Sequence, residues 1–125
     1  MSDLAKKRCI PCEEGGEPLV CERSEELLKQ LSPEWMLIDQ CRLLARTYHL
    51  KDFKQALDLV NKIGALAEDE GHHPDITLGY GSVGIELMTH AVGGLSENDF
   101  ILAAKISAIG GQERHFLDII PSKGP

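Results

Sequence analysis

The feature that most constrains the fold is a long amphipathic stretch in the middle of the chain, "KDFKQALDLVNKIGALAEDEG", at residues 51–71. Its apolar residues recur at steps of three and four, which is the spacing of one face of an α-helix. These residues are Phe53, Ala56, Leu57, Val60, Ile63, Gly64 and Ala67. Asp52 stands three positions before Gln55, as in a capping box, and Gly71 suits the left-handed residue that closes a helix. The stretch therefore predicts a helix that buries one face against the rest of the protein.

The chain before this helix has the patterns of a short helix and two strands. Ser24 is a good N-cap for a helix over "SEELLKQL", and Pro33 stops that helix. The segments "WMLI" (35–38) and "RLLARTYHL" (42–50) are typical of strands, and the second alternates with period two. The short turn "DQC" joins them, which predicts an antiparallel hairpin.

The chain after the long helix repeats this order. The segments "DITLGY" (75–80) and "VGIELMTH" (83–90) alternate with period two around a "GS" turn. A last helix follows the N-cap Ser96 and stops at the glycines at 110 and 111. The order α-β-β-α-β-β-α predicts an α+β fold, with one four-stranded antiparallel sheet and about three helices packed on one face. If the other face is apolar, a second copy of the chain could cover it.

Length and composition fit one compact domain. The chain has 125 residues, of which 42% are hydrophobic and 26% charged, so it can bury a core and is not a disordered sequence. Charge, glycine and proline are frequent at the start. We therefore expect a flexible N-terminal arm at residues 1–23, a single domain at 24–115 and a C-terminal tail at 116–125.

The net charge of −7 argues against several classes of partner. Nucleic-acid phosphates require clustered Lys and Arg, and an anionic membrane would repel the chain. No apolar run approaches the roughly 20 residues that span a bilayer, and "MSDLAKKRCIPC" has no signal-peptide core. We expect a cytoplasmic protein whose partners, if it has any, are proteins.

The chain has four cysteines, Cys9, Cys12, Cys21 and Cys41. "CIPC" has the spacing of half a zinc site or of a redox pair. No second half completes a zinc site, and the strand and helix expected around a redox motif are missing. We expect free thiols in a reducing compartment.

Three histidines converge in the predicted fold. His72 and His73 stand where the long helix gives way to a strand, and His90 ends the next strand of that hairpin. An antiparallel hairpin returns residue 90 to the neighbourhood of residues 73 to 75. Three imidazoles suit a zinc site, proton transfer or simply a polar loop. Adjacent histidines on an extended chain point to opposite sides, which makes a shared metal awkward.

Two carboxylates have both an ordinary and a functional interpretation. Asp99 lies in the first turn of a helix, where the helix dipole favours a negative charge. It would also face one of the three histidines and orient it. Glu68 suits the solvated last turn of the long helix, but it stands four residues before His72 and is also placed to fix that ring.

The spacing of these residues resembles the signature of the pterin-4a-carbinolamine dehydratases, also called 4a-hydroxytetrahydrobiopterin dehydratases or dimerisation cofactor proteins. The matching positions are Glu68, His72, His73, Pro74, Tyr80, His90 and Asp99. "KDFKQALDLVNKIG" and "THAVGGLSENDF" are similar to the family as well, and the resemblance covers about residues 24–110. It implies a four-stranded antiparallel sheet with helices on one side, and a homodimer or homotetramer.

The resemblance also implies the reaction and its residues. The substrate would be 4a-hydroxytetrahydrobiopterin, which loses water to give quinonoid dihydropterin without a metal or cofactor. His72 and His90 would be the proton-transfer pair, and His73 would bind the substrate and steady its charge. Thr89 would offer backbone groups to the pterin, and Asp99 and Glu68 would orient the site. The alternatives are a protein-binding dimerisation or regulatory module, or a dehydratase for another pterin, such as one linked to molybdopterin.

Two positions depart from the pattern of many relatives. Gly71 stands where many have an acidic residue, and Asn98 stands where many have Arg before the aspartate. Neither departure removes an imidazole, but both can alter substrate binding. The arm that contains "CIPCEEGGEPL" resembles arms of some microbial members, and the sequence assigns it no chemical role.

Overall fold

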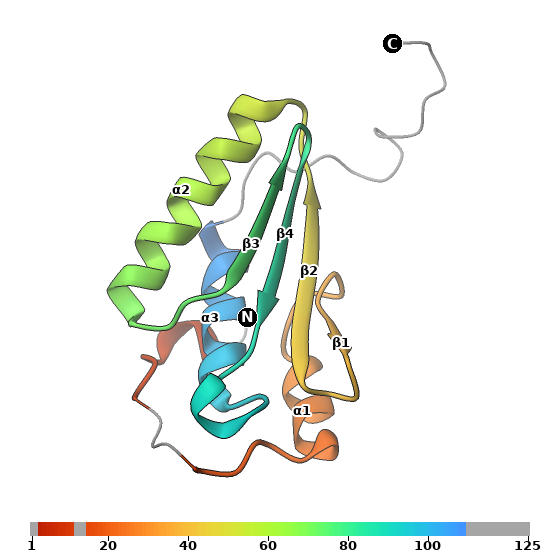
Figure 1. Cartoon of the computed structure of the whole chain (residues 1–125), viewed down its shortest axis with the longest axis vertical. Coiled ribbons are helices and arrows are strands. Elements are labelled where there is room, and N and C mark those ends of the chain that lie inside the picture. Colours follow the sequence, from red (N-terminus) through yellow and green to blue (C-terminus); the bar gives the residue numbers. More distant parts are fainter. Residues whose placement is uncertain (1–2, 12–14, 110–125) are drawn as a thin grey trace.

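The computed structural model describes residues 3–11 and 15–109 of the chain. Four strands form one antiparallel sheet in the order β1-β2-β4-β3. Figure 1 shows the helices packed beside this sheet. The predicted α+β class and the order α-β-β-α-β-β-α are confirmed. The elements are η1 (Asp3–Lys6), α1 (Cys21–Leu28), β1 (Met36–Ile38), β2 (Leu43–His49), α2 (Phe53–Glu70), β3 (Asp75–Gly79), β4 (Ser82–Leu87), η2 (His90–Val92) and α3 (Glu97–Ile109).

The core lies between the helices and one face of the sheet. In β2, Leu44 and Tyr48 are buried on this face, opposite Leu87 and Val83 of β4. Helices α2 and α3 supply the facing side chains, including Ala56, Leu59, Ile63, Phe100, Leu102 and Ile106. The period-two alternation of the strands therefore sorts their residues as the sequence predicts.

The opposite face of the sheet is only partly buried in the single chain. Its centre has small or polar residues, such as Thr47 of β2 paired with Gly84 of β4. Its edge is more apolar, because Met36, which is 55% exposed, pairs with Ala45. Covering of this face by a second copy stays a prediction.

The caps predicted for the long helix are present in α2. The Asp52 side chain accepts a hydrogen bond from the Gln55 amide at 2.9 Å, which satisfies one of the free N–H groups at the helix start. Gly71 closes the helix in the left-handed region with φ of 68°. This closure fixes where the histidine pair leaves the helix.

Two predicted boundaries are wrong. Helix α1 begins at Cys21 rather than after Ser24, because the Ser24 amide already bonds to the Val20 carbonyl and its side chain is buried inside the helix. Strand β4 ends at Leu87, so His90 lies in the 3₁₀ turn η2 instead of in a strand. The chain turns there because the Thr89 amide bonds to the Gly94 carbonyl at 2.7 Å. The predicted stop at residues 110 and 111 lies outside the described residues, as does the tail.

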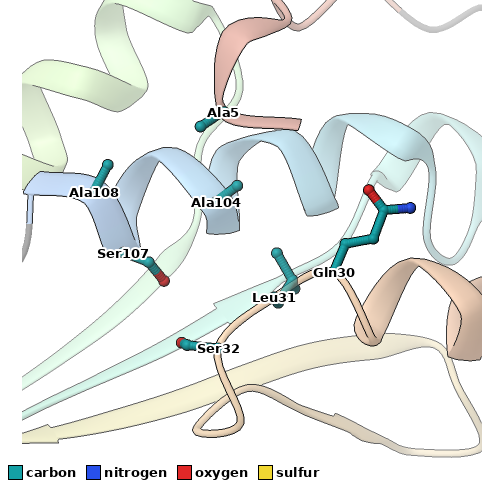
Figure 2. A pocket seen from close by; sticks show the side chains of 7 residues that line it. All are labelled: Ala5, Gln30, Leu31, Ser32, Ala104, Ser107 and Ala108. Atoms are coloured by element: carbon teal, nitrogen blue, oxygen red, sulfur yellow. The ribbon is translucent and has the colours of Figure 1, made fainter. Parts of the chain in front are cut away.

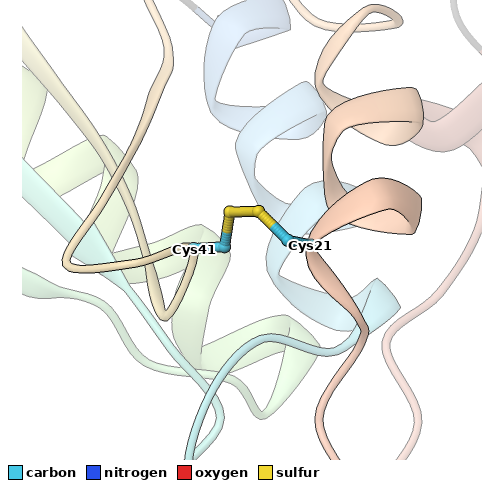
Figure 3. The surroundings of a disulfide bond; sticks show 2 residues. All are labelled: Cys21 and Cys41. Carbon is cyan, nitrogen blue, oxygen red and sulfur yellow. A yellow bond between two sulfur atoms is a disulfide. The ribbon is translucent and has the colours of Figure 1, made fainter.

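The prediction that the thiols are free is wrong for two cysteines. Cys21 and Cys41 form a disulfide with a Cα–Cα distance of 5.5 Å, and Figure 3 shows it joining the start of α1 to the β1–β2 turn. Three residues of this turn, Asp39, Gln40 and Cys41, have positive φ, which places the Cys41 side chain towards α1. The pairing depends on how the helix packs on the hairpin, so no sequence spacing indicated it. Cys9 is free, and Cys12 lies outside the described residues.

Part of the predicted N-terminal arm contacts the domain. The turn η1 packs on α3, where Leu4 is buried in the core. The division into arm, domain and tail at residues 23 and 115 stays a prediction. Among the helices of residues 3–11 and 15–109, none has the length and apolar character needed to span a membrane.

Candidate functional site

A polar cavity of about 260 Å³ lies at the end of the sheet where α2 leads into β3 and β4 leads into η2. Gly71 ends α2 in a left-handed turn and sends the chain directly into His72 and His73. On the neighbouring strand, the chain leaves β4 and enters the turn that begins with His90. All three predicted histidines line this cavity. Its lining residues are Ile10, Pro11, Gly71, His72, His73, Met88, Thr89, His90, Ala91 and Asn98.

His72 is held by a buried carboxylate. Its Nε2 lies 2.6 Å from Oδ1 of Asp99, and the two side chains are 12% and 0% exposed. The second oxygen of Asp99 accepts hydrogen bonds from the Thr89 hydroxyl and the Ser96 amide, each at 2.9 Å. A buried carboxylate with three donors is fixed in place, and it fixes the ring bonded to it.

His73 has a carboxylate partner too, but an exposed one. Its Nε2 lies 2.5 Å from Oε2 of Glu68, and the side chains are 59% and 78% exposed. The sequence placed Glu68 against His72, which is wrong. The helical spacing of four residues does not continue past Gly71, because the left-handed turn redirects the chain there. An exposed pair of this kind holds its ring only weakly.

His90 and Thr89 differ in their exposure and in their hydrogen-bond partners. His90 is exposed, and within the described residues its ring has no hydrogen-bond or ion-pair partner. Thr89 is buried and directs its hydroxyl to Asp99, while the hydroxyl of Ser96 lies 2.7 Å from it. Its backbone N–H and C=O already bond to Gly94 and Val92. Thr89 therefore supports Asp99 rather than presenting a free amide to a ligand.

Two buried polar residues, Glu70 and Asn98, were not among the predicted site residues, although Asn98 lines the cavity. Burial alone would raise the pKa of the Glu70 carboxyl. A hydrogen bond from the Cys9 amide and the charges of Lys105 and Arg8 hold this pKa below its usual value of 4.5 instead. The sequence showed that Asn98 departs from the pattern of many relatives. It gave no signal for Glu70, because a single Glu at the end of a helix is usually a solvated residue.

The three histidines are not arranged as ligands of one metal ion. Across residues 3–11 and 15–109, one group of three His, Cys, Asp or Glu side chains has its ligand atoms within 4.8 Å of one another, namely Cys21, Glu25 and Cys41. The sulfurs of that group are bonded to each other. The histidine cavity instead has one ring fixed by a carboxylate and one ring that has no partner within residues 3–11 and 15–109, which is an arrangement suited to proton transfer.

A second cavity, of about 210 Å³, lies between α3, η1 and the segment after α1. Figure 2 shows that apolar and uncharged polar side chains from these three segments line it. They are Ala5, Gln30, Leu31, Ser32, Ala104, Ser107 and Ala108. This lining contains no histidine, thiol or carboxylate, so it offers no group for acid–base chemistry.

Comparisons with known proteins find a matching family and several relatives. The family described as "Pterin 4 alpha carbinolamine dehydratase" matches residues 17–109. A protein of Rubrobacter xylanophilus is 45% identical over 109 residues, covering 87% of this chain and 100% of its own. One of Alkaliphilus metalliredigens is 48% identical over 106 residues, covering 85% and 95%. Both bear the name pterin-4-alpha-carbinolamine dehydratase as a provisional assignment.

Two solved structures share the fold. A transcriptional coactivator/pterin dehydratase from Brucella melitensis superposes with a TM-score of 0.70 at 30% identity, over 76% of this chain and 100% of its own. A pterin dehydratase-like protein identified as a RuBisCO assembly factor in the alpha-carboxysome has a TM-score of 0.55 at 24% identity, covering 62% and 90%. The second likeness concerns the fold alone.

Proposed function

Because this chain belongs to the pterin 4 alpha carbinolamine dehydratase family, we propose that it removes water from 4a-hydroxytetrahydrobiopterin or a related 4a-hydroxytetrahydropterin. The product is the quinonoid dihydropterin. The observation that carries the proposal is the lining of one cavity by His72, His73 and His90, with His72 fixed by the buried Asp99.

The reaction needs two proton transfers. The bond between carbon 4a and its hydroxyl breaks, the hydroxyl leaves as water with an added proton, and N5 loses its proton as its electron pair forms the new double bond. A positioned general acid and a general base each contribute about 10²–10⁴-fold. His72 and His90 lie in the same cavity and fit these two roles.

The hydrogen bond to Asp99 suggests which role falls to His72. If Nε2 carries the proton that bonds to the carboxylate, the Nδ1 of the neutral ring has a free electron pair and can accept a proton. We assign His72 as the base that takes the proton from N5, and His90 as the acid for the hydroxyl. His73, with Glu68 beside it, would bind the substrate and steady its charge.

The test is the decay of 4a-hydroxytetrahydropterin absorbance with purified protein. His72→Ala and His90→Ala should each lower kcat by about 10² or more, since each removes an acid–base group. His49→Ala is the matched control, because His49 is exposed on β2 far along the sheet from the cavity lining. Full activity in both cavity variants would refute the assignment, and absence of activity in the wild type towards a panel of pterins would refute the function.

A second candidate is a dimerisation or regulatory module that binds a protein. The observation in its favour is the name of the Brucella structure, which includes a coactivator role. This candidate predicts partner capture that His72→Ala leaves unchanged.

A third candidate is a dehydratase for another pterin, such as one linked to molybdopterin. The same substrate panel distinguishes it from a dehydratase for 4a-hydroxytetrahydrobiopterin, because the two substrates differ only in the substituent on the ring.

We also propose that the chain forms a homodimer or homotetramer. Partly exposed apolar side chains at the β1 edge, including Met36 and Ile38, support an interface on the sheet face away from the helices. Light scattering should give two or four times the chain mass of 13.8 kDa. A monomeric mass at the concentration of the activity assay would contradict this proposal.

A further inference from the structure

The N-terminal arm contributes to the histidine cavity. Ile10 and Pro11 are part of its lining, together with the three histidines. They lie outside the family match, which begins at residue 17. The arm therefore adds a wall that the family match does not include.

Asn98 holds this wall with both ends of its carboxamide. Its Oδ1 accepts a hydrogen bond from the Ile10 amide at 3.0 Å, and its Nδ2 donates one to the Ile10 carbonyl. The Cys9 amide donates to Oε1 of Glu70 at 2.8 Å, and the Cys9 thiol lies 3.6 Å from the Asn98 carbonyl oxygen. Asn98 and Glu70 are both buried, so these bonds are shielded from water.

Charge strengthens the same attachment. The buried Glu70 carboxylate lies 3.3 Å from the Arg8 guanidinium and 3.5 Å from the Lys105 ammonium. Glu70 is two residues before His72 in the chain, and Asn98 directly precedes Asp99. The arm is thus bound to the two short segments that carry the fixed histidine and its carboxylate.

The arm also contacts the turn that carries His90. The Gly15 amide donates to the Ala91 carbonyl at 3.0 Å, and the Leu19 amide donates to the Leu95 carbonyl at 2.8 Å. Residues 8–11 and 15–19 therefore lie against both chain segments that form the cavity. Contacts on both sides set the position of the wall relative to all three imidazoles.

We propose that residues 8–11 form a substrate-contacting wall of the pterin site and that Asn98 is the positioning residue that keeps it there. The inference rests on the proposed function. A pterin is a flat ring with a polar edge and apolar faces, and Ile10 and Pro11 add apolar surface to the cavity that the polar histidines also line. Such contacts exist before and during the reaction, so they lower KM and leave the proton transfers unchanged.

Asn98→Ala removes both bonds to Ile10 and should raise KM about tenfold with kcat changed less than about twofold, the loss expected for one to two net hydrogen bonds. Ile10→Ala should raise KM about threefold, and it cannot unfold the core because Ile10 is 68% exposed. Asn61→Ala is the matched control, since Asn61 is exposed on α2. An unchanged KM in both arm variants would overturn the proposal while the dehydratase function stands.

The Cys9 thiol reports on the arm without any pterin. Burial, and then the nearby charge of Glu70, raise the pKa of Cys9 to about 12, so the wild-type thiol should alkylate slowly. Release of the arm by Asn98→Ala should speed alkylation of Cys9 by about 100-fold or more, with the site identified by mass spectrometry. An unchanged rate would show that Asn98 does not hold the arm and would overturn the proposal.

Binding of oxidised biopterin, followed by its fluorescence, separates the two proposals. If the wild type binds biopterin but has no dehydratase activity, and Asn98→Ala weakens binding about tenfold, the wall stands and the function fails. If the wild type neither binds nor reacts, both are overturned.

Discussion

Asp99→Asn is the sharpest test of the roles assigned in the cavity. The carboxylate accepts three hydrogen bonds, from His72 through one oxygen and from Thr89 and Ser96 through the other. An asparagine amide has one oxygen. If that oxygen keeps the bonds to Thr89 and Ser96, the NH₂ group faces Nε2 of His72.

The consequence for His72 is a change of tautomer. An NH₂ group can only donate, so Nε2 must accept and the ring proton moves to Nδ1. The nitrogen assigned to take the proton from N5 then has no free electron pair. The analogous exchange in a Ser-His-Asp triad lowers kcat about 10⁴-fold. We expect a fall of about 10²–10⁴-fold here, the range for losing one acid–base group.

The fold should survive this change. Asp99→Asn replaces three charge-assisted hydrogen bonds by neutral ones, at about 1 kcal/mol each or about 3 kcal/mol in total. A domain of this size is stable by about 5–15 kcal/mol, so the variant stays folded at room temperature. Asp99→Ala would instead remove the acceptor of the Ser96 amide and leave the Thr89 hydroxyl only the Ser96 hydroxyl as a partner, and it would confuse loss of activity with loss of structure.

The assay combines pterin turnover with ¹⁵N NMR of the histidine rings, which reports the tautomer of His72. Asp58→Asn is the matched control, because Asp58 is exposed on α2. Wild-type kcat in Asp99→Asn would refute the assignment of His72 as the base. A low kcat with the proton still on Nε2 would show that the carboxylate acts by its charge and not through the tautomer.

Two further predictions concern the arm and the disulfide. Because the pKa of Glu70 is lowered in the folded protein, its stabilisation of the arm is complete above pH 4.5 and is lost as the pH falls through the lower folded pKa. Hydrogen exchange of the Cys9 amide, which bonds to Glu70, should therefore become faster in acid. Glu70→Gln should abolish this pH dependence. Replacing Cys21 and Cys41 together by Ser should lower the free energy of unfolding, measured by urea denaturation, by about 3 kcal/mol for a loop of this length. The kcat should not change, because both cysteines lie outside the cavity lining. An unfolding midpoint equal to that of the wild type would contradict this prediction.

The sequence was sufficient where local rules decide the structure. The caps of α2, Asp52 and Gly71, follow from hydrogen-bonding and backbone requirements of single residues. The hairpin then brings His90 back towards His72 and His73 whatever else the chain does. Periodicity and pairing therefore predicted both the sheet and the meeting of the histidines.

The sequence was insufficient where distant segments meet through packing. The bonds between Ile10 and Asn98 join residues 88 apart, and the Cys21–Cys41 bond depends on how α1 packs on the first hairpin. Glu68 was paired with the wrong histidine because helical spacing was extended beyond a left-handed residue. The first two contacts depend on tertiary placement that no local pattern encodes, whereas the Glu68 error is local, because Gly71 was itself predicted to close the helix.

The different surroundings of His72 and His90 allow the two rings to have different roles in the cavity. Both rings line the same cavity, but His72 is almost fully buried against an unexposed carboxylate, whereas His90 is exposed and has no partner in the part of the chain that the structure describes. A fixed ring can accept a proton at one defined nitrogen, whereas an exposed ring can exchange its proton with water and adjust to the leaving hydroxyl. Two like side chains in unlike surroundings are what an enzyme needs to run acid and base chemistry side by side. This asymmetry supports His72 as the base and His90 as the acid, and it would be lost if Thr89 and Ser96 did not hold Asp99.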